Sequence, residues 1–197
     1  MKDRINGIRK EARASWWEDG ITEIVAGLGV LVIGSVGISG YALEGRVPPW
    51  SYAVFILLMV ALAFGIRWVV LWAKERWVWP HTGYSVVKGR GGKYLIPFYL
   101  IVIALLALAF LFPSYTPIVG GTVGAVILVS LALYNGLRRF YALALLSFVL
   151  GILLYSVGIR DDRATFLILI GVGSVMFFLG VLRFARFKRE VSSVHEG

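Results

Sequence analysis

The chain has 197 residues, of which 59% are hydrophobic and only 16% charged, and its formal net charge is +9. A soluble domain is typically about 45–50% apolar and about 25% charged, so this chain has too little polar surface for a water-soluble globule. It contains no cysteine and two histidines, which excludes disulfides, thiolate metal sites and cysteine nucleophiles and removes most Ser-His chemistry. We therefore expect an integral membrane protein with no cofactor and no metal site.

The first element along the chain is a basic, amphipathic stretch at residues 1–20. In a helix, Ile5, Ile8 and Trp16 would face lipid while the basic side chains face the headgroups, which is typical of a segment lying in the membrane interface. A frayed cytoplasmic tail is the alternative interpretation.

Six apolar segments follow, and each is long enough to cross about 30 Å of hydrocarbon, which takes about 20 helical residues. They are Ile21–Leu43, Pro49–Trp72, Tyr94–Phe112, Thr116–Leu137, Phe140–Ile159 and Ala164–Phe184. Every backbone polar group must be satisfied within lipid, and the runs are continuous rather than alternating, so helices are expected and not barrel strands. The sequence predicts an all-α bundle of six transmembrane helices over residues 21–187 and a tail at 188–197.

The distribution of basic residues predicts the orientation of this bundle. With six spans, 16 of the 20 Lys and Arg residues fall on the side that holds both termini, and three fall on the other side. Basic residues concentrate in cytoplasmic segments, so a multi-pass protein of the cell membrane with both termini in the cytoplasm is expected. The net positive charge then reflects topology and attraction to anionic lipid headgroups, and no nucleic-acid binding is expected.

The largest predicted element outside the membrane is the cytoplasmic loop at residues 73–93. Pro80 ends the helix of the second span, and Thr82, Gly83 and Tyr84 favour a turn. This part of the chain reads Trp79-Pro80-His81-Thr82-Gly83-Tyr84.

Together with Trp17-Glu18-Asp19-Gly20 ahead of Glu23, this segment resembles a group of uncharacterised prokaryotic multi-pass membrane proteins. That group joins an acidic-Gly-x-x-Glu entry to the first span with an aromatic-Pro-Arg-Thr-Gly-Tyr segment in the cytoplasm. Here His81 stands at the position of the arginine. The resemblance covers about the first half of the chain, and it implies membrane topology and location without any known activity.

Two charged residues fall inside predicted spans, where charge is costly and often functional. Glu23 lies near the start of the first span and Arg67 lies in the second. Counted from the short loop between these spans, their depths agree to within roughly one helical turn at about 1.5 Å per residue. The sequence therefore predicts an ion pair between Glu23 and Arg67. The alternative is an Arg67 that reaches the headgroups beside a solvated Glu23.

The carboxylates Glu18, Asp19 and Glu23 surround the start of the first span, and the positive end of the helix dipole is a sufficient explanation for them. Small residues form a second pattern, because glycines at helical spacing allow close backbone approach between membrane helices. The candidate helix-packing positions are Gly27, Gly34, Gly120, Gly124, Gly173 and Gly180. Packing within the chain is the main interpretation, and a face for a partner membrane protein or a homo-oligomer is the alternative.

Two classes of function remain open. The first is a non-enzymatic membrane component, namely a scaffold, a sensor or an accessory subunit. The second is a small-solute permease or the substrate-binding subunit of a transporter, because six helices in about 200 residues resemble the S-components of energy-coupling-factor transporters. The first span lacks the Ala-x-x-x-Ala motif of that group, and few polar residues fall within the spans. Since a solute path usually requires more polar groups, the sequence favours the first class.

Overall fold

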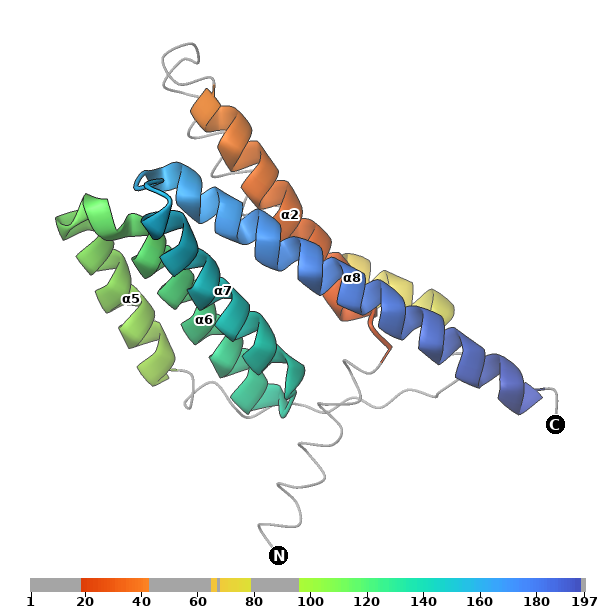
Figure 1. Ribbon diagram of the computed structural model, residues 1–197. Helices are drawn as coiled ribbons and strands as arrows, with labels where there is room; N and C mark the ends of the chain where they lie inside the picture. Colours follow the sequence, from red (N-terminus) through yellow and green to blue (C-terminus); the bar gives the residue numbers. More distant parts are fainter. Residues whose placement is uncertain (1–18, 43–64, 67, 79–95, 196–197) are drawn as a thin grey trace, which may run out of the picture.

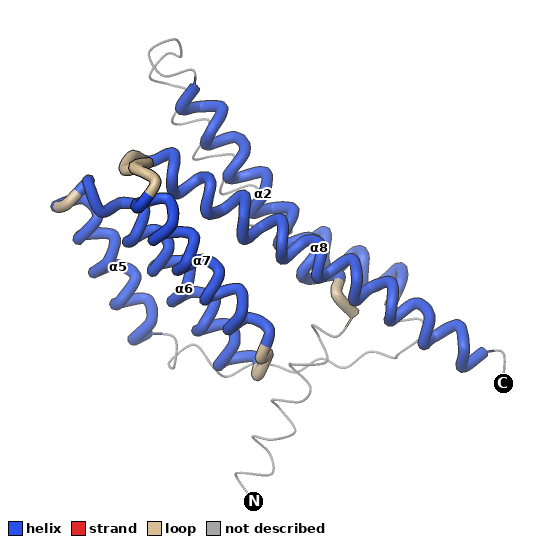
Figure 2. Tube along the Cα trace, viewed as in Figure 1, coloured by secondary structure: helices blue, strands red, loops and turns tan. Residues whose placement is uncertain are grey.

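The computed structural model describes residues 19–42, 65–66, 68–78 and 96–195, and nearly all of these residues are helical (Figures 1 and 2). Short turns join the helices within 96–195. No strand occurs in these ranges, as expected for an all-α protein. Residues 65–66 and 68–77 are helical. The other elements are α2 (Ile21–Ala42), α5 (Ile96–Leu111), the 3-10 turn η2 (Pro113–Tyr115), α6 (Thr116–Asn135), α7 (Arg139–Ser156) and α8 (Asp162–His195).

Four of the described helical segments are long and apolar enough to cross a membrane. They are Ile21–Gly40, Pro113–Asn135, Arg139–Ser156 and Asp162–Arg189, and they correspond to the predicted spans one, four, five and six. Most of the predicted second span lies outside the described residues, and α5, within the predicted third span, has 16 described residues.

The α2 and α8 helices run antiparallel and in close contact along most of α2 (Figure 1). A methyl group added at Gly27 would lie 2.9 Å from the carbonyl oxygen of Gly173, and one added at Gly180 would lie 2.6 Å from the amide nitrogen of Ile24. Gly34 likewise faces the backbone of α8 at Phe166. Each helix therefore contributes two glycines seven residues apart, and at these glycines the two backbones are in direct contact.

The α6 and α7 helices form a second close pair. Gly121 and Gly151 face each other, and a methyl group added at Gly121 would lie 2.9 Å from the Cα atom of Gly151. The buried Ser147 hydroxyl donates a hydrogen bond of 3.0 Å to the Gly121 carbonyl oxygen across this contact. The hydroxyl can reach this carbonyl because the two glycines bring the helix backbones close together.

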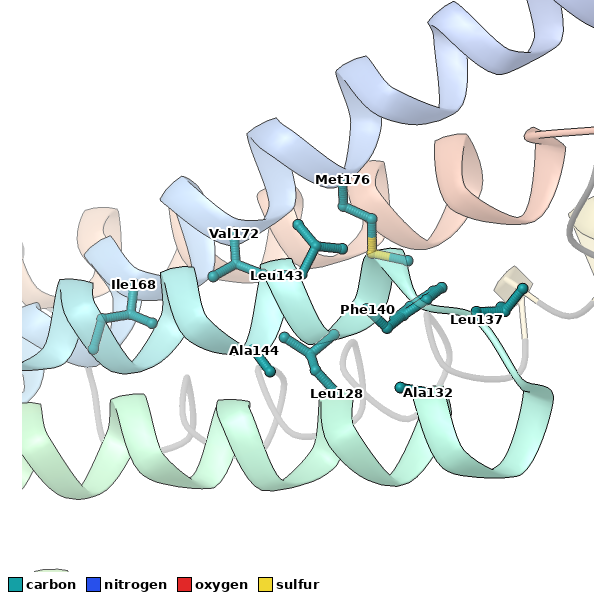
Figure 3. Packing of buried hydrophobic residues seen from close by; sticks show 9 residues of the cluster. All are labelled: Leu128, Ala132, Leu137, Phe140, Leu143, Ala144, Ile168, Val172 and Met176. Carbon is teal, nitrogen blue, oxygen red and sulfur yellow. The ribbon is translucent and has the colours of Figure 1, made fainter.

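An apolar core joins the α6–α7 pair to α8 (Figure 3). Phe140 is fully buried at the start of α7, and Val172 and Met176 reach it and its neighbours from α8. The cluster comprises Leu128, Ala132, Leu137, Phe140, Leu143, Ala144, Ile168, Val172 and Met176. Burial of side chains of this size stabilises helix contact chiefly through dispersion when the surroundings are lipid.

The α8 helix is longer than a bilayer requires. Its 34 residues span about 51 Å at about 1.5 Å per residue, against about 30 Å of hydrocarbon. It continues without interruption past the predicted end of the sixth span at Phe184 and through most of the predicted tail 188–197. Residues 68–78 lie beside this extension, since Trp77 packs against Phe184.

Replacing Ser147 by alanine is expected to lower the free energy of unfolding by about 1 kcal/mol, because it removes the hydrogen bond to the Gly121 carbonyl. Ser156→Ala is the matched control, since the exposed Ser156 hydroxyl bonds only to the Leu153 carbonyl in its own helix. Unfolding in mixed detergent micelles measures both variants. Equal losses would contradict a special role for the α6–α7 hydrogen bond.

Candidate functional site

Five charged side chains from four elements meet near the start of α2, and we call Asp19, Glu23, Lys74, Arg139 and Arg183 the buried charge cluster. Asp19, Glu23 and Lys74 expose only 3%, 2% and 1% of their surface. Buried charge is costly unless it is paired, so such a cluster in an otherwise apolar bundle is the main candidate for a functional site.

The first pair joins the residue before α2 to the helix of residues 68–77. Gly20 has a positive φ of 78°, a conformation that glycine adopts readily, and its carbonyl accepts the first hydrogen bond of α2 from Ile24. This turn lets Asp19 Oδ1 accept the Ile21 N–H at 2.9 Å while Asp19 Oδ2 accepts a hydrogen bond from Lys74 Nζ. Burial lowers the pKa of the Lys74 ammonium from its ordinary value, and the Asp19 carboxylate opposes that shift.

The second pair joins α2 to α7. Glu23 Oε1 forms an ion pair with Arg139 Nε. The turn between α6 and α7 places this arginine, because Gly136 has a φ of 74° and both Gly136 and Leu137 donate backbone hydrogen bonds to the Ala132 carbonyl. A left-handed glycine directly after the last helical residue is a common helix ending, and here α7 starts at Arg139 shortly afterwards.

The fifth member comes from α8. The Cβ atom of Arg183 lies close to Gly20, within 2.9 Å of where a methyl group on that glycine would be. Its positive charge acts on Glu23. The Nη1 atom of Arg183 is buried and has no hydrogen-bond partner among the described residues.

Aromatic side chains flank the cluster. Trp72 and Trp77 pack edge to face with ring centroids 5.5 Å apart, and Trp77 lies 6.4 Å from the Phe184 ring. Beneath them Ile21, Ala73 and Val78 form a small buried core with Phe184 and Phe187. Trp72 and Trp77 are each 49% exposed, which is typical of side chains at a membrane–water interface.

The structure places the sequence-derived candidates as follows. Glu23 lies in the buried charge cluster, but its partner there is Arg139. Arg67 lies outside the described residues, so the proposed pair of Glu23 with Arg67 stays a prediction. The residues of the predicted cytoplasmic loop, Trp79, Pro80, Thr82, Gly83 and Tyr84, and the carboxylate Glu18 also lie outside the described residues.

Among the glycines, Gly27, Gly34, Gly173 and Gly180 lie in the contact of α2 with α8. Gly120 and Gly124 do not share one partner, because Gly120 faces Thr165 of α8 and Gly124 faces Ser147 of α7. The glycine of α6 that faces a glycine of α7 is Gly121, which meets Gly151, a pair that the sequence reasoning did not single out.

Lys74, Arg139 and Arg183 are the functional candidates that sequence reasoning missed, since all three were counted only as cytoplasmic charge. One signal for them is their position within one or two turns of a span end, where a long basic side chain can turn back toward a buried carboxylate. The described residues contain no group of three or more His, Asp or Glu residues arranged to hold a metal ion.

The fold and this cluster define the protein as an all-helical chain with four helices suited to cross a membrane and a buried set of ion pairs at one end of them. Comparisons with protein-family models, with curated proteins and with solved structures find no significant match to the chain.

Proposed function

We propose that this chain is a non-enzymatic component of the cell membrane, a scaffold or accessory subunit that holds a partner protein or a second copy of itself. The observation that carries this proposal is that polar side chains within the described spans form hydrogen bonds inside their own helices. Hydroxyl and amide donors at Thr122, Ser130, Asn135 and Ser174 bond to carbonyls four residues earlier in their own helices. The three hydroxyl hydrogens and one of the two amide hydrogens of Asn135 are therefore not available to line a path for a solute.

A face for a partner is supported by the side chains that the bundle leaves outside. Leu145 of α7 and Phe178 and Leu182 of α8 are 64%, 64% and 58% exposed. In a bilayer such residues contact lipid or the helix of another membrane protein, and close association there depends on packing rather than on hydrophobic burial.

Photo-crosslinking in native membranes tests this proposal. A crosslinking residue at Phe178 or Leu182 should give one discrete protein adduct, and the same residue at the buried Leu143 should give none. Adducts with lipid alone from every exposed position would contradict a scaffold or accessory role.

A small-solute permease, or the substrate-binding subunit of one, is the second candidate. The buried charge cluster favours it, because charged residues within membrane bundles often mark substrate or ion pathways. A stable ATPase partner or a tightly held small molecule in the protein purified from native membrane would support this second candidate over the first.

The proposed topology is six spans with both termini in the cytoplasm. It is supported by the division of Lys and Arg between the two sides. Reporter fusions after Arg46 and Asp162 should be active only outside the membrane, and fusions after Gly89 and at Gly197 only in the cytoplasm. A single reversed position would contradict the six-span arrangement.

A further inference from the structure

The described helices form two close pairs, and the contact between the pairs differs from the contact within them. Within the α2–α8 pair and within the α6–α7 pair, glycines bring the helix backbones together. Between the pairs the contact is made through side chains, such as Met176 of α8 against Phe140 of α7 (Figure 3). Side chains can repack where two backbones in contact cannot, so relative motion is expected between the helix pairs rather than within them.

The two helix pairs are connected at one end by the turn between α7 and α8, residues 157–161 (Figure 1). Gly158 in this turn has a φ of 90°, and nothing lies within 4 Å of where a methyl group on it would be. The turn is therefore a suitable hinge, because no neighbouring side chain opposes a change in its backbone angles. At the opposite end of α7, the ion pair of Glu23 with Arg139 links the two helix pairs.

Arg183 of α8 is a second guanidinium group within reach of Glu23. Its Cβ atom lies within 2.9 Å of where a methyl group on Gly20 would be. Gly20 precedes Glu23 by one helical turn, and positions one turn apart lie about 5–6 Å apart, which is less than the length of an extended arginine side chain. The positive charge of Arg183 acts on Glu23. The carboxylate thus has one guanidinium partner in the other helix pair and a second guanidinium group in its own.

Glu23 and Arg183 both have unused hydrogen-bonding atoms. Glu23 Oε2 and Arg183 Nη1 are buried and have no hydrogen-bond partner among the described residues, and leaving such atoms unsatisfied costs free energy. A hydrogen bond between them would remove both costs. Asp19 does not compete for Arg183, because its two oxygens already accept hydrogen bonds from the Ile21 N–H and from Lys74. The Arg139 side chain is 21% exposed, so it can turn toward water when Glu23 leaves it.

We propose that Glu23 exchanges between Arg139 and Arg183 and thereby controls the spacing of the two helix pairs at this end of the bundle. Bound to Arg139, as in the structure, Glu23 holds α7 against α2. Bound to Arg183, it forms an ion pair within the α2–α8 pair, and the α6–α7 pair is free to move away about the turn at 157–161. Motion of one helix group against another is a common conformational change in membrane proteins. The exchange goes beyond the proposed function, since a scaffold and a permease could both use it.

Distances between spin labels on introduced cysteines test the proposal in the full-length protein, which has no native cysteine. Labels at Tyr141→Cys and Leu182→Cys, both exposed, report the separation of α7 from α8 beside the cluster. Labels at Leu28→Cys and Phe178→Cys, also exposed, report the separation within the α2–α8 pair. Double electron–electron resonance is expected to give two distances for the first label pair and one for the second.

Opposite shifts in the two arginine variants distinguish exchange from a fixed ion pair. Arg139→Gln leaves Glu23 only Arg183, so the longer α7–α8 distance should become more populated. Arg183→Gln leaves Glu23 only Arg139, so the shorter distance should become more populated. Each variant should change the ratio of the two distances by about tenfold, which is the effect of one hydrogen bond to a charged group. Arg186→Gln is the matched control, because Arg186 is exposed on α8 and should leave the ratio unchanged.

Lysine variants decide the question if a glutamine variant does not fold. Arg139→Lys and Arg183→Lys keep the positive charge but lack the paired donors of a guanidinium group, so each should shift the ratio in the same direction as its glutamine variant, by about threefold. One α7–α8 distance that no arginine variant alters would overturn the proposal, and so would shifts of the Arg139 and Arg183 variants in the same direction. A change in the control distance between α2 and α8 would also overturn it, because that helix pair would then not move as a unit.

Discussion

Gly27→Ala is expected to lower the free energy of unfolding by about 3 kcal/mol, which is the upper part of the usual cost of overpacking a core. The added methyl group would lie 2.5 Å from the amide nitrogen of Phe177 and 2.9 Å from the carbonyl oxygen of Gly173. Both obstacles are backbone atoms, so no rotamer change relieves the clash and the helices α2 and α8 must separate. Equilibrium unfolding in mixed detergent micelles measures the loss.

Gly40→Ala is the matched control within the same helix, because nothing lies within 4 Å of a methyl group at that position. The control is expected to be neutral or slightly stabilising, since alanine is the better helix former by up to about 1 kcal/mol. The double variant Gly27→Ala/Gly173→Ala should lose less than the sum of its single variants, because both glycines serve one contact. A Gly27→Ala protein as stable as the control would show that α2 and α8 do not touch there.

Hydropathy alone predicted the four described candidate spans closely. The predicted Ile21–Leu43 and Thr116–Leu137 agree with α2 and α6 to within two residues, because the polar and turn-forming residues that end each apolar run also end each helix. The apolar run does not give the end of α8, which extends to His195, beyond the predicted span. Arg, Lys and Glu are good helix formers, so the helix continues after the apolar run has ended.

The partners within the candidate site could not be predicted in the same way. Counting residues from a hairpin loop gives the depth of a side chain and pairs it with the adjacent span, which is how Glu23 was matched with Arg67. The structure packs α2 against α8, the last helix of the chain, and brings Arg139 of α7 to Glu23; the Glu23–Arg67 pair stays a prediction, because Arg67 lies outside the described residues. Which helices become neighbours depends on where small residues allow close approach over long sequence separations, and hydropathy does not encode this.

The helix contacts in the structure also change the interpretation of the carboxylates at the start of α2. The helix dipole alone accounted for Asp19 and Glu23 at the level of sequence. In the structure each has a basic partner from another element, Lys74 and Arg139. These pairs link α2 to α7 and to residues 68–77, so they join parts of the bundle as well as neutralise charge.

Glu23→Gln is expected to lower the free energy of unfolding by about 3 kcal/mol, because removing one partner leaves the other charge without compensation in a buried place. Glu23 in α2 is 2% exposed, and it forms its ion pair with Arg139 of α7. Arg139→Gln should cost somewhat less, since the Arg139 side chain is 21% exposed. Arg138→Gln is the control, because this neighbouring arginine is exposed and should be nearly neutral.

Double-mutant cycles then decide between the two partners considered for Glu23. A cycle of Glu23→Gln with Arg139→Gln should show a coupling of about 1–2 kcal/mol, which is the upper range for polar contacts in membrane bundles. The cycle of Glu23→Gln with Arg67→Gln should be additive if Arg139 is the partner that matters. Coupling to Arg67 and additivity with Arg139 would instead favour the adjacent-span pair, and the ion pair would then hold the first predicted hairpin together rather than join α2 to α7.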